Sequence, residues 1–205
     1  MTEQIARRRL TPKGEATRNR ILDAAISLIA AHGVAGTSTE QVRQAAGVSG
    51  SQLYHYFTTK QALIGAVILR QADAGPGAPA LGALDSLDAL EAWADAAVER
   101  QAEAGGRCDL NTLAAELSTG DAASRGEIRE GYERWRGVLL DGLRAMRDRG
   151  VLRADADLDE LALALLTAVQ GGSLLARTLG TAEPMRAAMH SALAFVRSYA
   201  AVPGA

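Results

Sequence analysis

The sequence predicts an all-α protein, and three observations support this. Hydrophobic residues make up 48% of the 205-residue chain, whereas aromatic residues make up only 4%. The apolar residues, many of them Ala and Leu, recur three and four positions apart, which is the spacing of one helix face. Gly, Ser and Asp stand where one periodic segment ends and the next begins. No strand pattern and no internal repeat stand out.

Four helices are expected in the N-terminal third. The first runs from about residue 15 to 32, and Gly33 ends it. Its apolar face is Ile21, Leu22, Ala25, Ile26 and Ile29. Two short helices follow within residues 38–57, and a fourth runs from about 59 to 73. Residues 1–14 are expected to form a disordered basic arm. Its Arg7, Arg8 and Arg9 either enter a minor groove or, as we favour, only solubilise the chain.

Five more helices are expected after a linker. Residues 75–85 contain three Gly and two Pro, which is typical of a linker. We expect an N-terminal domain at 15–69 and a C-terminal domain at 70–205. The C-terminal helices are expected at about 86–104, 108–118, 121–149, 157–179 and 183–199. Gly150 and Gly180 end two of them, and Asp157 is placed to cap the fourth.

Residues 38–60 carry the most specific pattern in the chain. Ser38 and Gln41 are spaced as a capping box at the start of a short helix, and Gly47 ends that helix. Val48 then fills the core under the turn, and Ser49 caps the next helix. This order predicts a helix-turn-helix, which places its second helix in the DNA major groove. A generic helical hairpin is the weaker alternative.

The second of these helices offers hydrogen-bonding side chains for DNA. Leu53 and Phe57 are four apart and face inward. The remaining residues face outward or sideways: Gly50, Ser51, Gln52, Tyr54, His55 and Tyr56. Tyr hydroxyls suit phosphates, and Gln52 suits a base edge, most naturally adenine. Lys60 stands where another helix begins, so its charge and that helix's amides can share one phosphate.

The charge distribution supports a DNA-binding N-terminal region. The net charge is −2, from 22 basic and 24 acidic residues. Residues 1–60 hold eight basic and four acidic residues, a balance of +4, which leaves 14 basic and 20 acidic residues, or −6, for the remainder. A basic head can approach phosphates, and an acidic body cannot.

Residues 15–69 resemble the DNA-binding domain of the tetracycline-repressor (TetR) family. The matching motifs are Arg20-Ile21-Leu22-Asp23-Ala24-Ala25, Gly33, Thr37-Ser38, Ala46-Gly47-Val48-Ser49, Leu53-Tyr54-His55-Tyr56-Phe57 and Lys60-x-x-Leu63. The resemblance implies base contacts from Gly50, Ser51 and Gln52, and phosphate contacts from Ser38, Tyr54, Tyr56 and Lys60. Arg43 departs from the small or apolar residue usual in the family. We favour an outward tilt towards a phosphate over a local irregularity. With Ser49 and His55, these residues form the expected DNA-binding set.

The C-terminal domain is expected to bind a small, largely apolar effector. Residues 107–118 resemble the Cys-x-x-x-x-Leu-Ala-x-Glu-Leu-Ser stretch of the LmrA/YxaF/QacR-like branch, whose members often control efflux or detoxification genes. The candidate ligand-binding residues are Trp93, Cys108, Leu110, Asn111, Leu113, Leu117, Tyr132, Trp135 and Leu139. Each of them either lines a pocket or simply fills the core.

The last two helices are expected to form a homodimer. Each has a wider apolar stripe than one core needs, so two from each subunit would make a four-helix bundle. TetR-like proteins dimerise through these helices, and the resemblance therefore implies the same here. The expected interface residues are Leu161, Leu165, Val169, Gly172, Ala176, Met189, Ala192, Phe195 and Val196.

Other functional classes are disfavoured. Asp155, Asp157 and Asp159 resemble the start of a calcium loop, but the positions of its glycine and bidentate glutamate are Glu160 and Leu166. No catalytic constellation, cofactor motif or metal ligand set is recognisable, so no enzyme activity, cofactor or metal is predicted. Without an 18-residue apolar run or a signal peptide, no membrane association is expected. One cysteine fits a reduced cytoplasm. The expected function is a ligand-released repressor on a palindromic operator. The alternatives are a DNA-binding dimer without an effector and, far less favoured, an α-helical enzyme.

Overall fold

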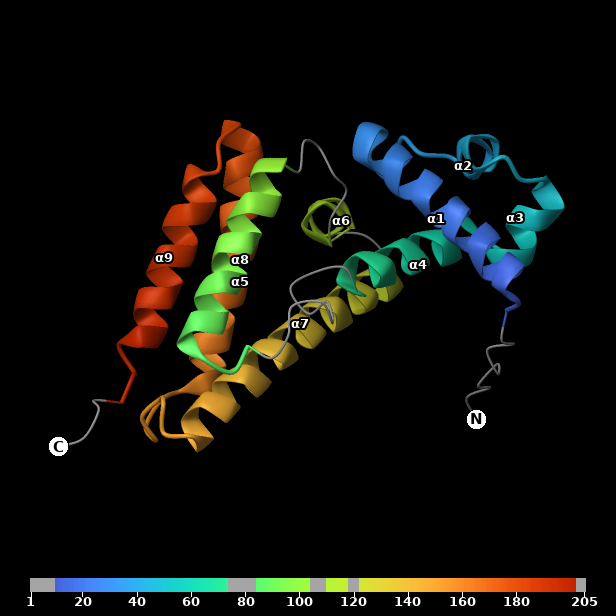
Figure 1. Ribbon diagram of the computed structural model, residues 1–205. Coiled ribbons are helices and arrows are strands. Elements are labelled where there is room, and N and C mark those ends of the chain that lie inside the picture. Colours follow the sequence, from blue (N-terminus) through green and yellow to red (C-terminus); the bar gives the residue numbers. More distant parts are fainter. Residues whose placement is uncertain (1–9, 74–83, 104–109, 118–121, 202–205) are drawn as a thin grey trace. The chain divides into compact units, whose positions relative to one another are not determined.

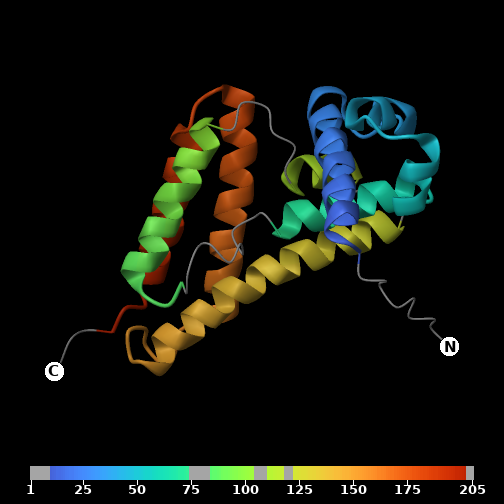
Figure 2. The same ribbon diagram turned by 45° about the vertical axis from the view of Figure 1, so that its right-hand side comes forward.

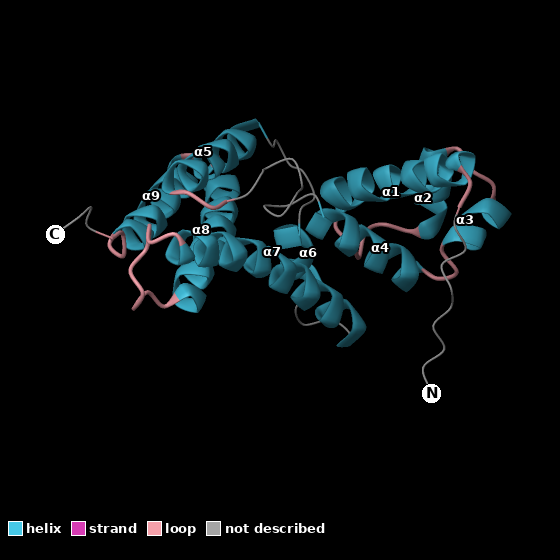
Figure 3. Ribbon diagram, turned by 60° about the horizontal axis from the view of Figure 1, so that its bottom comes forward, coloured by secondary structure: helices cyan, strands magenta, loops and turns pink. Residues whose placement is uncertain are grey.

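The computed structural model of the chain describes residues 10–73, 84–103, 110–117 and 122–201 (Figure 1). In these ranges it contains nine α-helices and no strand, as Figure 3 shows by colour. The helices are α1 (Pro12–His32), α2 (Thr39–Ala46), α3 (Gly50–Tyr56), α4 (Lys60–Asp73), α5 (Leu87–Glu103), α6 (Leu110–Leu117), α7 (Ala122–Asp148), α8 (Leu158–Leu179) and α9 (Glu183–Arg197). The all-α prediction is confirmed for the described residues.

The helix boundaries follow the capping residues. α1 begins at Pro12, three residues earlier than expected, because the Thr11 hydroxyl accepts a hydrogen bond from the Gly14 amide at 3.2 Å. Proline suits this first position because its missing N–H would have no partner in the helix. Residues 12–14 of the expected arm are therefore helical, whereas Arg7, Arg8 and Arg9 lie outside the described residues.

The chain divides into two compact units, Met1–Val67 and Ile68–Ala205. In the first unit, α1 packs against α2, and both contribute buried side chains to its core. The fully buried large residues of this core include Ile21, Leu22, Ile29 and Leu53. Leu63, Ile64 and Val67, from the start of α4, are also buried. α2, the turn and α3 therefore each contribute a buried side chain to this core: Val42, Val48 and Leu53.

In the second unit, α8 packs along α9 and α5 lies beside them (Figures 1 and 2). α7 contacts both α6 and α8. At Gly172 the backbones of α8 and α9 come close, since a Cβ there would lie 2.8 Å from the Met185 sulfur. The absence of a side chain at Gly172 therefore lets α9 approach α8 closely.

The C-terminal end of α4 is attached to α7 within the second unit. The indole N–H of Trp135 donates to the Ala72 carbonyl at 2.5 Å, and Arg134 pairs with Asp73 at 2.9 Å. Gly131 lies close enough to Ala72 that a Cβ on the glycine would be 3.0 Å from the alanine Cβ. α4 therefore begins in one unit and is anchored by its other end in the next.

Candidate nucleic-acid interface

Two capping boxes fold the helix-turn-helix locally. At α2, the Ser38 hydroxyl accepts from the Gln41 amide at 3.2 Å, and the Gln41 side chain accepts from the Ser38 amide at 2.8 Å. At α3, Ser49 and Gln52 repeat the arrangement. Gly47 joins the two helices in the left-handed conformation, with φ of 62°, which costs glycine little. The predicted helix-turn-helix is present, with its caps where the sequence predicted them.

One side of α3 is open to solvent. Ser51, Gln52, Tyr54 and His55 are exposed, and the Tyr54 side chain keeps 55% of its accessible surface. Leu53 and Phe57 are buried beneath them. An exposed face rich in hydroxyl, amide and imidazole groups carries the donors and acceptors that DNA contacts require.

Gln52 has one amide atom in use and one available. Its Oε1 accepts from the Ser49 amide at 2.9 Å, and its backbone N–H donates to the Ser49 hydroxyl at 3.1 Å. The sequence predicts a base-edge contact for Gln52, most naturally with adenine, and a bidentate contact of that kind uses both Oε1 and Nε2. With the capping box intact, Nε2 is the donor that remains, while one of the two lone pairs of Oε1 is already in use. That donor fits a base acceptor such as a purine N7.

Tyr56 and Lys60 both contact other segments of the first unit. The Tyr56 ring packs edge-on to His55 at 5.1 Å between centroids, and its hydroxyl is close to Gly14 at the start of α1. The Lys60 ammonium donates to the Val34 carbonyl at 2.9 Å. An ammonium has three N–H donors, so Lys60 can bond the Val34 carbonyl and still donate to a phosphate.

Arg43 is engaged inside the helix-turn-helix. Its Nε and Nη2 atoms bond both carboxylate oxygens of Glu40, at 2.8 and 2.6 Å, and its Nη1 donates to the Val48 carbonyl at 3.2 Å. Hydrogen bonds from Arg43 and then from Gln44 lower the pKa of Glu40 from 4.5 to about 2. Because the folded pKa is the lower one, the pair stabilises the fold above about pH 4.5. That contribution is lost as the pH falls towards 2.

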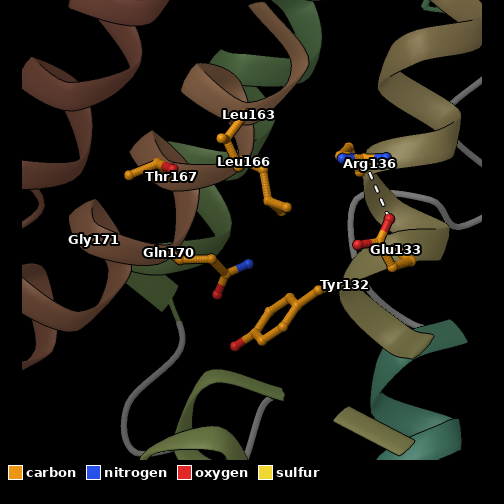
Figure 4. A pocket seen from close by; sticks show the side chains of 8 residues that line it. All are labelled: Tyr132, Glu133, Arg136, Leu163, Leu166, Thr167, Gln170 and Gly171. Atoms are coloured by element: carbon orange, nitrogen blue, oxygen red, sulfur yellow. Dashed lines mark ion pairs between the residues drawn. The ribbon is translucent and has the colours of Figure 1, made fainter. Parts of the chain in front are cut away.

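A cavity of about 420 Å³ lies between α7 and α8 in the second unit (Figure 4). Its lining residues are Tyr132, Glu133, Arg136, Leu163, Leu166, Thr167, Gln170 and Gly171. Figure 4 shows the Tyr132 ring and the Gln170 amide near each other, with the Glu133–Arg136 ion pair on the α7 side. Arg136 also lies 3.9 Å from Asp159. Its charge is therefore offset by two carboxylates.

The predicted ligand residues take different places. Tyr132 lines this cavity, whereas Trp93, Leu110, Leu113, Trp135 and Leu139 are buried and Leu117 is half-buried. Asn111 donates to the Gln170 carbonyl at 2.8 Å and so joins α6 to α8. Among the described residues, the indole N–H of Trp93 is buried without a hydrogen-bond partner. Cys108 lies outside them.

The predicted dimer residues prove to be mostly intramolecular. Eight of them are buried within one chain: Leu161, Leu165, Val169, Gly172, Ala176, Met189, Ala192 and Val196, while Phe195 is half-buried. Leu161, Leu165 and Val196 have no exposed surface in the single chain, so they pack within it. Gly172, Ala192 and Phe195, in contrast, line an exposed groove, and the predicted interface stays a prediction.

A different face of α8 and α9 is exposed and apolar. Leu163, Leu174, Leu175 and Leu179 each keep half or more of their surface. A groove of about 650 Å³ runs beside them, and Leu163, Ala164, Ala168, Leu175, Ala188 and Phe195 are among its lining residues. These positions also recur at helical spacing. The sequence alone does not distinguish this exposed face of α8 from the buried face beside it.

The three aspartates near residue 157 have structural roles. Asp157 caps α8 by accepting from the Glu160 amide at 3.0 Å, and Asp155 pairs with Arg153 at 3.1 Å. In the part of the chain that the structure describes, no group of three His, Cys, Asp or Glu side chains is placed to hold a metal ion.

Two family profiles match the chain. One, described as bacterial regulatory proteins of the tetR family, matches residues 21–67. The other, described as a tetracyclin repressor-like C-terminal domain, matches residues 83–192, which is more than half of the chain. Neither match identifies the LmrA/YxaF/QacR-like branch. A comparison with curated protein sequences found no match.

Solved structures of regulators share the fold. A TetR transcriptional regulator from Chloroflexus aurantiacus is 25% identical with a TM-score of 0.78, covering 93% of this chain and 98% of that one. The reduced form of NemR from E. coli is 23% identical with a TM-score of 0.77, covering 93% and 100%. A TetR-family regulator from Cytophaga hutchinsonii is 19% identical with a TM-score of 0.77, covering 94% and 98%.

Proposed function

The chain belongs to the TetR family of bacterial regulatory proteins, and from this premise we propose that it is a repressor released from a palindromic operator by a small ligand. As a member of that family it is a DNA-binding transcriptional regulator. The observation that carries the DNA-binding role is the solvent-exposed α3 face, held by two capping boxes and a left-handed Gly47. The sign of control and the effector are the proposed parts.

The DNA contacts are proposed as two groups. Gly50, Ser51 and Gln52, at the N-terminal end of α3, reach base edges, because the first turn of a recognition helix enters the groove. Ser38, Ser49, Tyr54, His55, Tyr56 and Lys60 contact or border phosphates, in keeping with their hydroxyl, imidazole and ammonium groups.

The dimer is proposed to form through the exposed face of α8 and α9. Several exposed leucines on one helix, two of them lining a groove, favour a protein contact there. A second copy of the chain would cover Leu163 and Leu175 and fill the groove with its own helices. By length and composition, α8 is also a candidate membrane span. Its packing against α7 and α9 instead favours a helix shared between a subunit core and a partner, and hence a cytoplasmic protein without membrane contact.

The effector is proposed to occupy the α7–α8 cavity. Ligand pockets are commonly 300–1,000 Å³ and mostly apolar with a few polar groups, and the cavity of about 420 Å³ falls in that range. Leu163 and Leu166 supply apolar surface, while Tyr132 and Gln170 supply hydrogen-bonding groups. The resemblance of residues 107–118 to the LmrA/YxaF/QacR-like branch adds a preference for apolar or aromatic ligands. A regulator without an effector is the rival proposal.

The operator can be identified by selecting random duplex DNA with the purified full-length protein. We expect a near-palindrome whose half-sites are one helical turn apart or a multiple of it, because a two-fold dimer presents its two α3 helices that way. Reporter expression with and without the gene then gives the sign of control. Enrichment of a single, non-repeated site would contradict the dimeric mode, and a fall in reporter expression on deleting the gene would contradict repression.

A further inference from the structure

Arg43 is tied to Val48 twice, across the turn of the helix-turn-helix. Its backbone carbonyl accepts from the Val48 amide at 3.2 Å, and its side-chain Nη1 donates to the Val48 carbonyl at 3.2 Å. Val48 is buried and directly precedes Ser49, the residue that caps α3. The two bonds therefore connect the last turn of α2 to the residue from which α3 starts.

Glu40 holds the Arg43 side chain in this position. Both carboxylate oxygens of Glu40 are bonded to the guanidinium, and Gln44 donates to one of them at 2.8 Å. A guanidinium is a planar fork that binds a carboxylate through two parallel N–H groups. The fork is thus oriented by α2 itself, which leaves Nη1 directed at the turn. The charges of the pair also offset each other.

On the premise that the protein binds DNA through α3, we propose that Arg43 is a positioning residue. It fixes the direction in which α3 leaves the turn, and it does so instead of contacting a phosphate. This differs from the outward tilt that the sequence favoured. The physical consequence is specific: base contacts depend on the exact placement of α3, whereas phosphate attraction depends mainly on charge. We call the Glu40–Arg43–Val48 bonds the brace. Loss of the brace lowers the ratio of operator to random-DNA affinity and leaves the electrostatic part of binding unchanged.

The two roles predict opposite results for Glu40→Gln. If Arg43 is a brace, the amide weakens the pair and α3 becomes less well placed, so the ratio of operator to random-DNA affinity falls. If Arg43 is a phosphate ligand, loss of the carboxylate frees the guanidinium. Its phosphate contact is then kept or strengthened, so the affinities for operator and random DNA rise together and their ratio does not fall.

The experiment measures DNA affinity of the full-length protein over a series of salt concentrations. The variants are Arg43→Ala, Arg43→Lys and Glu40→Gln, each on the selected operator and on random duplex of equal length. Arg144→Ala is the matched control, because Arg144 also pairs with an acid three residues earlier, Asp141, at 2.9 Å but bonds no turn. We expect each of the three variants to lose about tenfold on the operator, as for one charged hydrogen bond. Random-DNA affinity and salt slope stay at the wild-type values, and the control changes neither affinity.

Amide hydrogen exchange gives a second measurement that needs no DNA. If Arg43 braces the turn, the Val48 and Ser49 amides exchange about tenfold faster in Arg43→Ala than in wild type, while the amides of α1 are unchanged. The exchange rates test the proposal for Arg43 alone, because they are measured without DNA. If no operator can be selected, only the proposal that the protein binds DNA through α3 is contradicted. If Arg43→Ala does not fold, Arg43→Lys and Glu40→Gln are judged by the same criteria.

The proposal is overturned by any of three results. The first is a salt slope lowered by about one in Arg43→Ala on both DNAs. The second is wild-type discrimination in Arg43→Lys, which would mean that charge alone suffices. The third is unchanged exchange of the Val48 amide in a folded Arg43→Ala protein.

Discussion

Gln52 belongs both to the fold of α3 and to its expected contact with DNA. Oε1 closes the capping box with the Ser49 amide, and Nε2 is the atom that remains for a base. This division is a consequence of side-chain chemistry, since a glutamine amide has one acceptor atom and one donor atom. It favours a contact from Nε2 to one base acceptor.

Substitutions at Gln52 test this division. Gln52→Glu keeps an acceptor for the Ser49 amide but has no donor, so the cap survives and the preferred base at one operator position shifts towards cytosine, whose N4 amino group donates. Gln52→Ala loses both functions and costs about 1–3 kcal/mol on the operator. The measurement is repeated selection of DNA with each variant. Equal losses on operator and random DNA in Gln52→Ala would remove this residue from base recognition.

Lys60 joins a loop carbonyl and, we predict, a phosphate. Lys60→Ala should weaken binding to every sequence and lower the salt slope by about one. It should also reduce the stability of the first unit, because the Val34 carbonyl loses its donor at 2.9 Å. Salt titrations on operator and random DNA, together with thermal unfolding, separate the two effects. Reduced stability with an unchanged salt slope would mean that Lys60 serves only the loop.

At the scale of elements, the backbone of α7 passes very close to the segment before α5. A Cβ on Gly142 would lie 2.1 Å from the Leu84 carbonyl oxygen, whereas a Cβ on Gly137, also in α7, meets nothing within 4 Å. Gly142→Ala should therefore destabilise the second unit by about 1–3 kcal/mol through overpacking. Gly137→Ala should stabilise it by about 0.5–1 kcal/mol, since alanine favours a helix. Denaturant unfolding of the two variants measures the difference, and equal stabilities would show that Leu84 moves away at little cost.

The helix ends could be predicted because each is encoded locally. Ser38, Ser49, Asp157 and Gly180 cap or end a helix through bonds to residues three or four positions away, and such bonds depend on sequence spacing alone. α1 begins three residues before its predicted start because Thr11 supplies a cap there. Local signals thus suffice for the boundaries when every capping residue is weighed.

The faces of the apolar helices could not be predicted in the same way. α8 is apolar on more than one side, and periodicity alone does not say which stripe packs inside the chain. Leu165 is fully buried, whereas Leu163 keeps 54% of its surface. The cavity between α7 and α8 could not be predicted either, because Arg136, Thr167 and Gln170 come together only through packing of α7 on α8. The bonds from Arg43 to Glu40 and Val48 could not be predicted because they depend on the geometry of the turn.

At the scale of the whole molecule, dimerisation should depend on the exposed face of α8. Leu175 is 51% exposed and lines the groove, and Leu174 is 50% exposed but is not among the groove's lining residues. Leu175→Glu should split the dimer and abolish tight operator binding while each subunit stays folded. A charge at Val169, in contrast, should unfold the second unit, because that side chain is buried within the chain.

Thr178→Glu is the matched control for the dimer, since it adds the same charge to an exposed residue of α8 that is neither one of these leucines nor a lining residue of the groove. Sedimentation at micromolar concentration, circular dichroism and operator binding distinguish the cases. A Leu175→Glu protein that stays dimeric and binds the operator normally would place the interface elsewhere.

Ligand control should be visible as reciprocal linkage. An effector can displace the protein from DNA only by as much as it prefers the state that does not bind DNA, typically 1–3 kcal/mol, or roughly 5–150-fold. The end of α4 is attached to α7 through Trp135 and Ala72, and the Trp135 ring packs edge-on to the Tyr132 ring that lines the cavity, at 5.7 Å between centroids. A ligand beside Tyr132 should therefore change Trp135 fluorescence.

The chain has two tryptophans, so Trp93→Phe leaves Trp135 as the single reporter for ligand titrations. Saturating operator should weaken ligand binding by the same factor by which saturating ligand weakens operator binding, because both describe one thermodynamic cycle. Tyr132→Phe removes one hydroxyl from the cavity and should weaken a ligand that bonds it, without changing operator affinity in the absence of ligand. A ligand whose fluorescence titration is identical with and without saturating operator would disprove induction through this cavity. It would favour the rival proposal, in which the dimer acts without an effector and protein concentration alone sets operator occupancy.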